Sequence, residues 1–262
     1  MCGTKDTWKL GEQAQEFFVY ATLGIIPEKM FKNSSHTDIL SKIKGFENED
    51  VNYKVYCIFM CTKAAYNDLS RTLRYEEKYK SNSKDKNALK EKEQKLNCIC
   101  AELTKTIYNN DGILSNPEKL FNVLVDKEGN YRNCVNDLFV CLKEDEKDNL
   151  KFHFGQVQKW INMTLKYLYL LGIVENDNEL HIPIDSYIMK ALSDKGVKFP
   201  KQNGDMKEYS DINSVKWSRL NRHEYESIVE GYQNTILEDD PINWEHTAWI
   251  KQSEKEKGFD IY

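Results

Sequence analysis

Long apolar runs are missing from this sequence of 262 residues. No stretch comes near the roughly eighteen consecutive apolar residues that a membrane-spanning helix requires. The opening segment, MCGTKDTWKLGEQ, also lacks the charged region and the following apolar region that together mark a secretory signal. We therefore expect a soluble, cytoplasmic protein that has no membrane partner.

Patterns for metal, nucleotide and serine chemistry are missing as well. The seven cysteines include no CxxC pair, and the five histidines are too scattered to complete a zinc site. No GxxxxGKS or GxxxxGKT phosphate loop and no GxSxG nucleophile turn occurs. The odd cysteine count fits a reducing compartment, in which Cys57 and Cys61 would be small buried apolar residues. We expect neither a metal nor a cofactor.

Strand patterns are nearly absent, and the one short extended candidate is LHIPI at 180–184. Apolar residues instead recur at helical spacing through most of the chain, and an apolar content of 40% is enough for a core. The sequence therefore predicts an all-α fold. The expected helices cover about 7–23, 37–45, 53–80, 88–108, a segment starting at Pro117, 135–142, 154–171, a segment following Asp185, 221–237 and 241–253.

The most informative segment for function covers residues 154–192. On a helix, Lys159 and Lys166 project from the same side. Two ammonium groups on one face repel each other, and this repulsion favours the neutral amine that a nucleophilic lysine needs. Lys159 is the stronger candidate, because we place it in the first turn, where the helix N-terminus disfavours a cation. Lys166 is the alternative nucleophile.

Asp185 stands two residues after Pro183 and directly before a helical pattern. An aspartate in this place is a natural N-cap, since its side chain can accept hydrogen bonds from the first free backbone amides. This structural role is one interpretation. The other is that Asp185 is the partner carboxylate of a lysine nucleophile.

The run GQVQK and the later IPID step resemble the helix-hairpin-helix Gly-Pro-Asp DNA glycosylases, and within them the archaeal-type 8-oxoguanine DNA glycosylases most of all. These enzymes have a catalytic lysine, a second lysine seven residues later and a downstream aspartate, places that Lys159, Lys166 and Asp185 take here. A second segment, PINWEHTAW at 241–249, is similar to their C-terminal helix. The first 150 residues match only in being helical.

The resemblance implies a two-lobed helical DNA glycosylase fold with an atypical helix-hairpin-helix, in a single unit of residues 1–262. Its lobes would cover roughly 30–150 and 151–262, with the N-terminal helix packing across them. It also implies catalysis by Lys159 and Asp185. The other implied site residues are Lys166, Asn162, Trp244, Glu245 and Trp249 in or beside a base pocket, and Gly155 and Gln156 at a DNA phosphate.

Two departures from the family pattern bear on DNA binding and base choice. The family's hairpin turn reads Leu-Pro-Gly-x-Gly, whereas this chain has Gly155 alone. We therefore expect an atypical hairpin. Glu245 stands where the family tends to have aspartate, which lengthens the reach of the carboxylate toward the base.

The activity that the resemblance implies is that of a monomeric DNA glycosylase and abasic-site lyase. Lys159 would form a Schiff base with the sugar of a flipped nucleotide, while Asp185 would stabilise the cationic sugar. The base would be 8-oxoguanine or a bulky modified base of invading phage DNA. The net charge of −5 argues against indiscriminate coating of DNA and calls for a compact site. The alternative is a non-catalytic helical interaction protein of a bacterial defence system.

Overall fold

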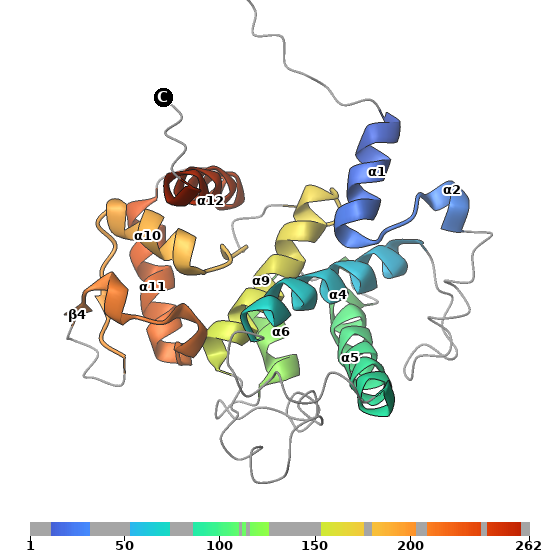
Figure 1. Ribbon diagram of the computed structural model, residues 1–262, viewed down its shortest axis with the longest axis horizontal. Helices are drawn as coiled ribbons and strands as arrows, with labels where there is room; N and C mark the ends of the chain where they lie inside the picture. Colours follow the sequence, from blue (N-terminus) through green and yellow to red (C-terminus); the bar gives the residue numbers. More distant parts are fainter. Residues whose placement is uncertain are drawn as a thin grey trace, which may run out of the picture.

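Helices account for most of the structure (Figure 1). The computed structural model describes residues 12–31, 53–73, 86–109, 112–113, 116–125, 153–175, 180–202, 209–236 and 240–257. In these ranges no helix is long and apolar enough to cross a membrane. The predicted all-α class is confirmed, since the strands of the described residues are all two residues long.

The N-terminal helices are α1 (Glu12–Leu23), α2 (Glu28–Phe31), α4 (Tyr53–Leu73), α5 (Lys86–Ile107) and α6 (Pro117–Leu124). After them come α9 (Phe154–Leu170), α10 (Ser186–Asp194), the 3-10 turns η3 (Ile212–Ser214) and η4 (Trp217–Arg219), α11 (Arg222–Thr235) and α12 (Pro241–Lys257). Two antiparallel pairs join β1 (Tyr108–Asn109) to β2 (Gly112–Ile113) and β3 (Phe199–Pro200) to β4 (Tyr209–Ser210).

The helices predicted from periodicity recur in the structure with ends shifted by about one turn or less wherever those ends are described. The helices expected at 37–45 and 135–142 lie outside the described residues. The short helix α2 was not expected, because its residues lie between the helices predicted at 7–23 and 37–45.

The prediction of a strand at 180–184 is wrong. This irregular segment pairs its backbone with side chains of α9 instead of with a strand. Gln158 accepts a hydrogen bond from the Ile184 N–H at 3.2 Å and donates one to the Ile184 carbonyl at 2.7 Å. Because the buried amide of Gln158 satisfies both backbone groups, no neighbouring strand is needed. The segment thereby leads Asp185 to the side of α9.

Helix α9 is the central helix, and twelve of its seventeen residues are buried. It packs against α4, α6, α11 and η4. Trp160 is fully buried, and its indole N–H donates to the Thr62 carbonyl of α4 at 2.9 Å. In Figure 1, α1, α4 and α5 lie on one side of α9, and α10, α11 and α12 lie on the other. Helix α9 contacts helices of both groups, so its contacts do not separate two lobes. The predicted lobe boundary near residue 150 therefore stays a prediction.

The start of α9 is fixed by a close approach of η4. The Gly155 N–H donates to the Leu220 carbonyl at 2.9 Å, and a Cβ at position 155 would lie 1.8 Å from the Trp217 carbonyl oxygen. Any side chain there would collide with backbone, so glycine is required for packing. This contact brings Trp217 next to Lys159, whose amine lies 5.4 Å from the centre of the Trp217 ring.

Cys57 and Cys61 lie in the core on α4, as predicted. Both are free thiols, and both are buried. Burial raises the pKa of the Cys57 thiol to about 11, so it stays neutral at physiological pH. The two cysteines therefore contribute apolar packing.

Candidate functional site

Lys159 and Asp185 form an ion pair between α9 and the start of α10. The Lys159 Nζ lies 2.6 Å from the Asp185 Oδ2, and their side chains are 12% and 11% exposed. Lys159 is the sixth residue of α9, beyond the first turn in which we predicted it. The helix N-terminus acts mainly within that first turn, so the predicted effect of the helix end on Lys159 loses its basis.

Asp185 uses its two carboxylate oxygens for two different tasks. Oδ1 accepts hydrogen bonds from the backbone N–H groups of Tyr187 and Ile188, both at 3.0 Å, and so caps α10. Oδ2 accepts from Lys159 and, at 3.1 Å, from the indole N–H of Trp249. Capping and pairing with lysine, which the sequence left as alternatives, therefore coexist in one side chain.

The pKa of Asp185 is lowered from its usual value. Burial alone would raise this pKa, but the charge of Lys159 and the hydrogen bonds from Lys159, Ile188 and Trp249 outweigh it. Asp185 is therefore ionised at neutral pH, which leaves a fixed negative charge next to the Lys159 amine.

A second ion pair, between Lys166 and Glu245, lies on the same side of α9. Their side chains are 10% and 2% exposed, and Glu245 belongs to α12. Burial raises the pKa of Glu245 and outweighs the opposing charge of Lys166, while the charge of Asp185 adds to the increase. The two lysines thus each have a carboxylate of their own.

Two tryptophans flank the Lys159–Asp185 pair. Trp249 of α12 is 38% exposed and packs edge-on against Tyr187, with ring centres 5.2 Å apart. Trp217 of η4 faces the Lys159 amine in a cation–π contact. Sequence reasoning missed Trp217, because it stands 58 residues after Lys159 in a segment without a motif.

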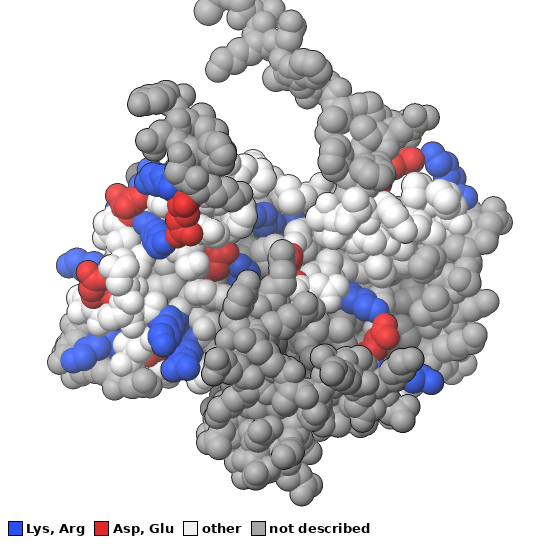
Figure 2. All heavy atoms as spheres, in the orientation of Figure 1, with Lys and Arg blue, Asp and Glu red and all other residues white. Residues whose placement is uncertain are grey.

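Both ion pairs open onto one cavity of about 1160 Å³. Helix α9 lines it from Lys159 to Leu170, a span of about 16 Å at the helical rise per residue. In the view of the molecule in Figure 2, acidic and basic side chains lie close together near the centre. The other walls come from α1, α4, α10, η4 and α12 and include Thr22, Gly24, Met60, Lys63, Ala64, Asp68, Asp185, Trp217, Glu245 and Trp249.

The structure brings five of the predicted site residues together at this cavity: Lys159, Asp185, Lys166, Glu245 and Trp249. Their chemical roles stay predictions.

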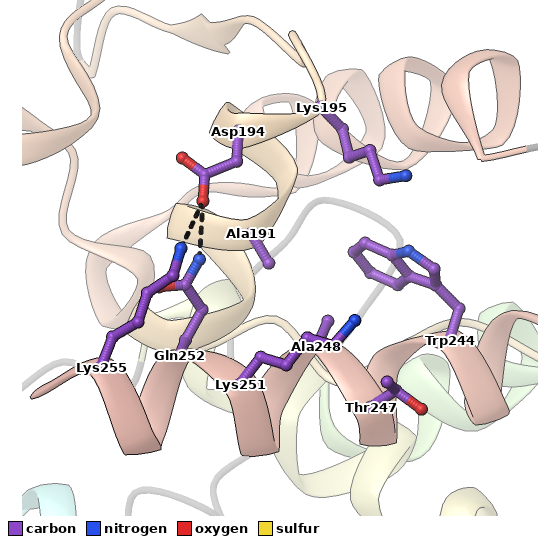
Figure 3. Close-up of a pocket in the computed structure, with 9 residues that line it drawn as sticks. All are labelled: Ala191, Asp194, Lys195, Trp244, Thr247, Ala248, Lys251, Gln252 and Lys255. Atoms are coloured by element: carbon purple, nitrogen blue, oxygen red, sulfur yellow. Dashed lines mark hydrogen bonds and ion pairs between the residues drawn. The ribbon is translucent and has the colours of Figure 1, made fainter. Parts of the chain in front are cut away.

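Asn162 and Trp244 do not belong to the cavity. Asn162 is fully buried and donates hydrogen bonds to the Ile182 carbonyl at 3.3 Å and to the Tyr225 hydroxyl at 3.0 Å. Asn162 lies three residues after Lys159 on the helix, but its amide is already bonded to the segment before α10 and to α11, so it serves packing. Trp244 lines a smaller cleft of about 290 Å³ between α10 and the opposite side of α12 (Figure 3).

Gly155 and Gln156 are placed for packing and not for binding a DNA phosphate. The Gly155 N–H is taken by the Leu220 carbonyl, and the Gln156 N–H donates to the His153 carbonyl at 2.9 Å. The Gln156 side chain is buried and accepts from the His153 N–H at 2.8 Å. Neither backbone amide is available to an anion, so the predicted phosphate contact has no support from their positions.

Within the described ranges, no three His, Cys, Asp or Glu side chains gather as metal ligands. Comparison with protein-family models, with curated proteins and with solved structures gives no match. The chemistry of the cavity and of the α9 and α12 residues that line it is therefore what indicates a function.

Proposed function

We propose that this chain is a DNA glycosylase with abasic-site lyase activity. One observation carries the proposal: a single oxygen of Asp185 contacts both the Lys159 amine at 2.6 Å and the Trp249 indole N–H at 3.1 Å, beside a large cavity. A nucleophile, an anion and an aromatic surface thus lie within reach of one flipped nucleotide.

The proposed reaction starts when the Lys159 amine attacks C1′ of the flipped deoxyribose and the bond from C1′ to the base breaks. The base leaves with the bonding electron pair and takes up a proton, and the sugar ring opens to give a Schiff base on Lys159. Loss of a C2′ proton then expels the 3′ phosphate and nicks the strand. Attack requires the neutral amine, so the Lys159 ammonium first gives up one proton, and this is the proton that the leaving base takes up.

Asp185 has an electrostatic role in this scheme. Its lowered pKa keeps it ionised, so a negative charge faces the sugar as positive charge develops there. Its capping bonds to the backbone of α10 hold that charge in place before the substrate arrives. This arrangement avoids reorganisation during the reaction.

The size and lining of the cavity favour a bulky modified base over 8-oxoguanine. A volume of about 1160 Å³ exceeds the usual range for small-molecule pockets, about 300 to 1,000 Å³. Beyond Lys159 the walls include the adaptable side chains of Met60 and Met163 and the small residues Gly24 and Ala64. Lys166 and Glu245 add a donor and an acceptor that can read polar groups on the base.

Borohydride trapping on DNA tests the proposed function. Duplexes would carry one modified base each, including 8-oxoguanine and pyrimidines with large substituents at C5, beside an unmodified duplex. We expect a covalent adduct between protein and DNA with a bulky base, no adduct for Lys159→Arg, and an adduct for the matched Lys166→Arg. Arginine keeps the positive charge that faces Asp185 but forms no Schiff base under these conditions.

Two results would contradict the proposal: no adduct across the whole panel, or an adduct in the Lys159→Arg protein. Circular dichroism must accompany the assay, because breaking a buried ion pair costs about 3 to 5 kcal/mol. The absence of any adduct would favour a non-catalytic interaction protein, for which the Lys159–Asp185 pair is only a cap and a bridge between helices.

A further inference from the structure

A second, smaller hollow lies between the end of α10 and α12. It has a volume of about 290 Å³, and Trp244, only 7% exposed, forms part of its wall. In Figure 3 the side chains of Lys195 and Lys251 extend toward the indole of Trp244 from α10 and α12. We call this hollow the α10–α12 groove.

The α10–α12 groove is basic although the chain as a whole is acidic. Three lysines line it, and the one aspartate there, Asp194, is held by Lys255 at 3.3 Å and by Gln252 at 2.8 Å. Among the described residues, Lys195 and Lys251 have no carboxylate partner. Two uncompensated ammonium groups therefore share one hollow, and they would attract an anion.

The groove and the large cavity lie on either side of an exposed crest of α12. Residues that face the cavity, such as Glu245 and Trp249, and residues that face the groove, such as Lys251, project from nearly opposite sides of the helix. The stripe between them carries two exposed uncharged residues, Thr247 at the edge of the groove and Ile250 at the edge of the cavity, and Glu254 follows one turn later.

The width of α12 corresponds to about three phosphate steps along one DNA strand. A helix with its side chains is about 10 to 12 Å across. One DNA strand advances about 3.4 Å per phosphate along the duplex axis. The groove is therefore about three nucleotides away from a base that enters the cavity.

We propose that the α10–α12 groove binds backbone phosphates of the DNA whose flipped base occupies the cavity, with Lys195 and Lys251 as the contacting residues. This inference rests on the proposed function. It also replaces the phosphate contact that Gly155 and Gln156 do not offer, since their amides are bonded within the protein. The duplex then crosses α12 over Thr247 and Ile250.

The test is the salt dependence of binding to an unmodified duplex, measured by fluorescence anisotropy. Each lost phosphate contact reduces the slope of log K against log salt by about 0.9 in magnitude, so Lys195→Gln/Lys251→Gln should reduce it by about 1.8. The matched control is Lys90→Gln/Lys119→Gln, which removes the same charge from α5 and α6, far from α12 in Figure 1. Its slope should stay within about 0.3 of the original protein.

The outcomes separate this inference from the proposed function. An equal loss of slope in both double variants would show general charge attraction and overturn the groove assignment. An unchanged slope in the groove variant, with adduct formation intact, would also overturn it and leave the glycosylase proposal standing. If the original protein binds no DNA and traps no adduct, both proposals fall together.

Discussion

The two lysine–carboxylate pairs of α9 differ in how many donors surround the acid. Asp185 accepts four hydrogen bonds, from Lys159, Trp249 and two backbone amides, and its pKa is lowered despite burial. Glu245 is more deeply buried and relies mainly on Lys166, and its pKa is raised. A neighbouring lysine therefore does not decide the charge of a buried acid; the full set of donors does.

This difference divides the cavity into two ends with different electrostatics. At the Lys159–Asp185 end a fixed anion is suited to a sugar that becomes positive. At the Lys166–Glu245 end the acid gives up its charge more readily, which suits the recognition of a base and of its polar groups.

Asp185→Asn should slow base release on the order of 10³-fold, the scale of losing a preorganised electrostatic contact in an active site. An asparagine cannot serve both tasks, because its NH₂ group must face either the donors Lys159 and Trp249 or the amides of α10. Single-turnover kinetics on a DNA duplex that gives an adduct in the borohydride assay would measure the effect. Glu245→Gln is the comparison, and we expect it to change base preference more than overall rate.

The stability of Asp185→Asn supplies the control for this prediction. The folded pKa of Asp185 is lowered, so its contribution to stability is present above the unfolded value near 3.8 and is lost as the pH falls through the folded pKa. The variant should thus be less stable than the original protein at pH 7, with the gap closing in acid. A gap that does not change with pH would contradict the electrostatic account of this end.

Trp249→Ala should weaken binding of DNA with a flipped modified base by about 1 to 3 kcal/mol, or roughly 5- to 150-fold, the usual range for one base stack. Trp249→Phe should recover part of this loss, since it restores a ring but not the N–H that reaches Asp185. The matched control is Tyr209→Ala, which removes an exposed aromatic ring away from the cavity. Equal losses in both alanine variants would remove Trp249 from the base site.

Local sequence rules could place the two lysines and Asp185 but not the residues around them. Helical periodicity puts Lys159 and Lys166 on one face, and the capping preference of aspartate marks Asp185 as the start of α10. Trp217 reaches Lys159 only because η4 packs on Gly155, a contact between distant segments that has no local pattern. The same contact takes the amide of Gly155, so a motif that suggests a phosphate site serves packing instead.

The extended segment before Asp185 shows a related limit of sequence patterns. The alternation of LHIPI is typical of a strand, but Gln158 and Asn162 of α9 satisfy its backbone from the side. By helical periodicity Asn162 belongs to the same polar face of α9 as Lys159 and Lys166. A buried amide that bonds a neighbouring backbone and one that binds a ligand look the same in a sequence.

The smallest expected effect concerns stability at the Lys166–Glu245 end. Replacing the pair with Lys166→Met/Glu245→Gln should leave the free energy of unfolding at pH 7 unchanged or raise it on the order of 1 kcal/mol, as for other buried ion pairs replaced together. The folded pKa of Glu245 is raised, so its favourable contribution is present below the unfolded value near 4.5 and is lost as the pH rises through the folded pKa. The advantage of the double variant should therefore grow from pH 4 to pH 7, measured by urea unfolding. Destabilisation that is greatest at pH 7 would mean that Glu245 keeps its charge as firmly as Asp185 does, and the two ends of the cavity would then be alike.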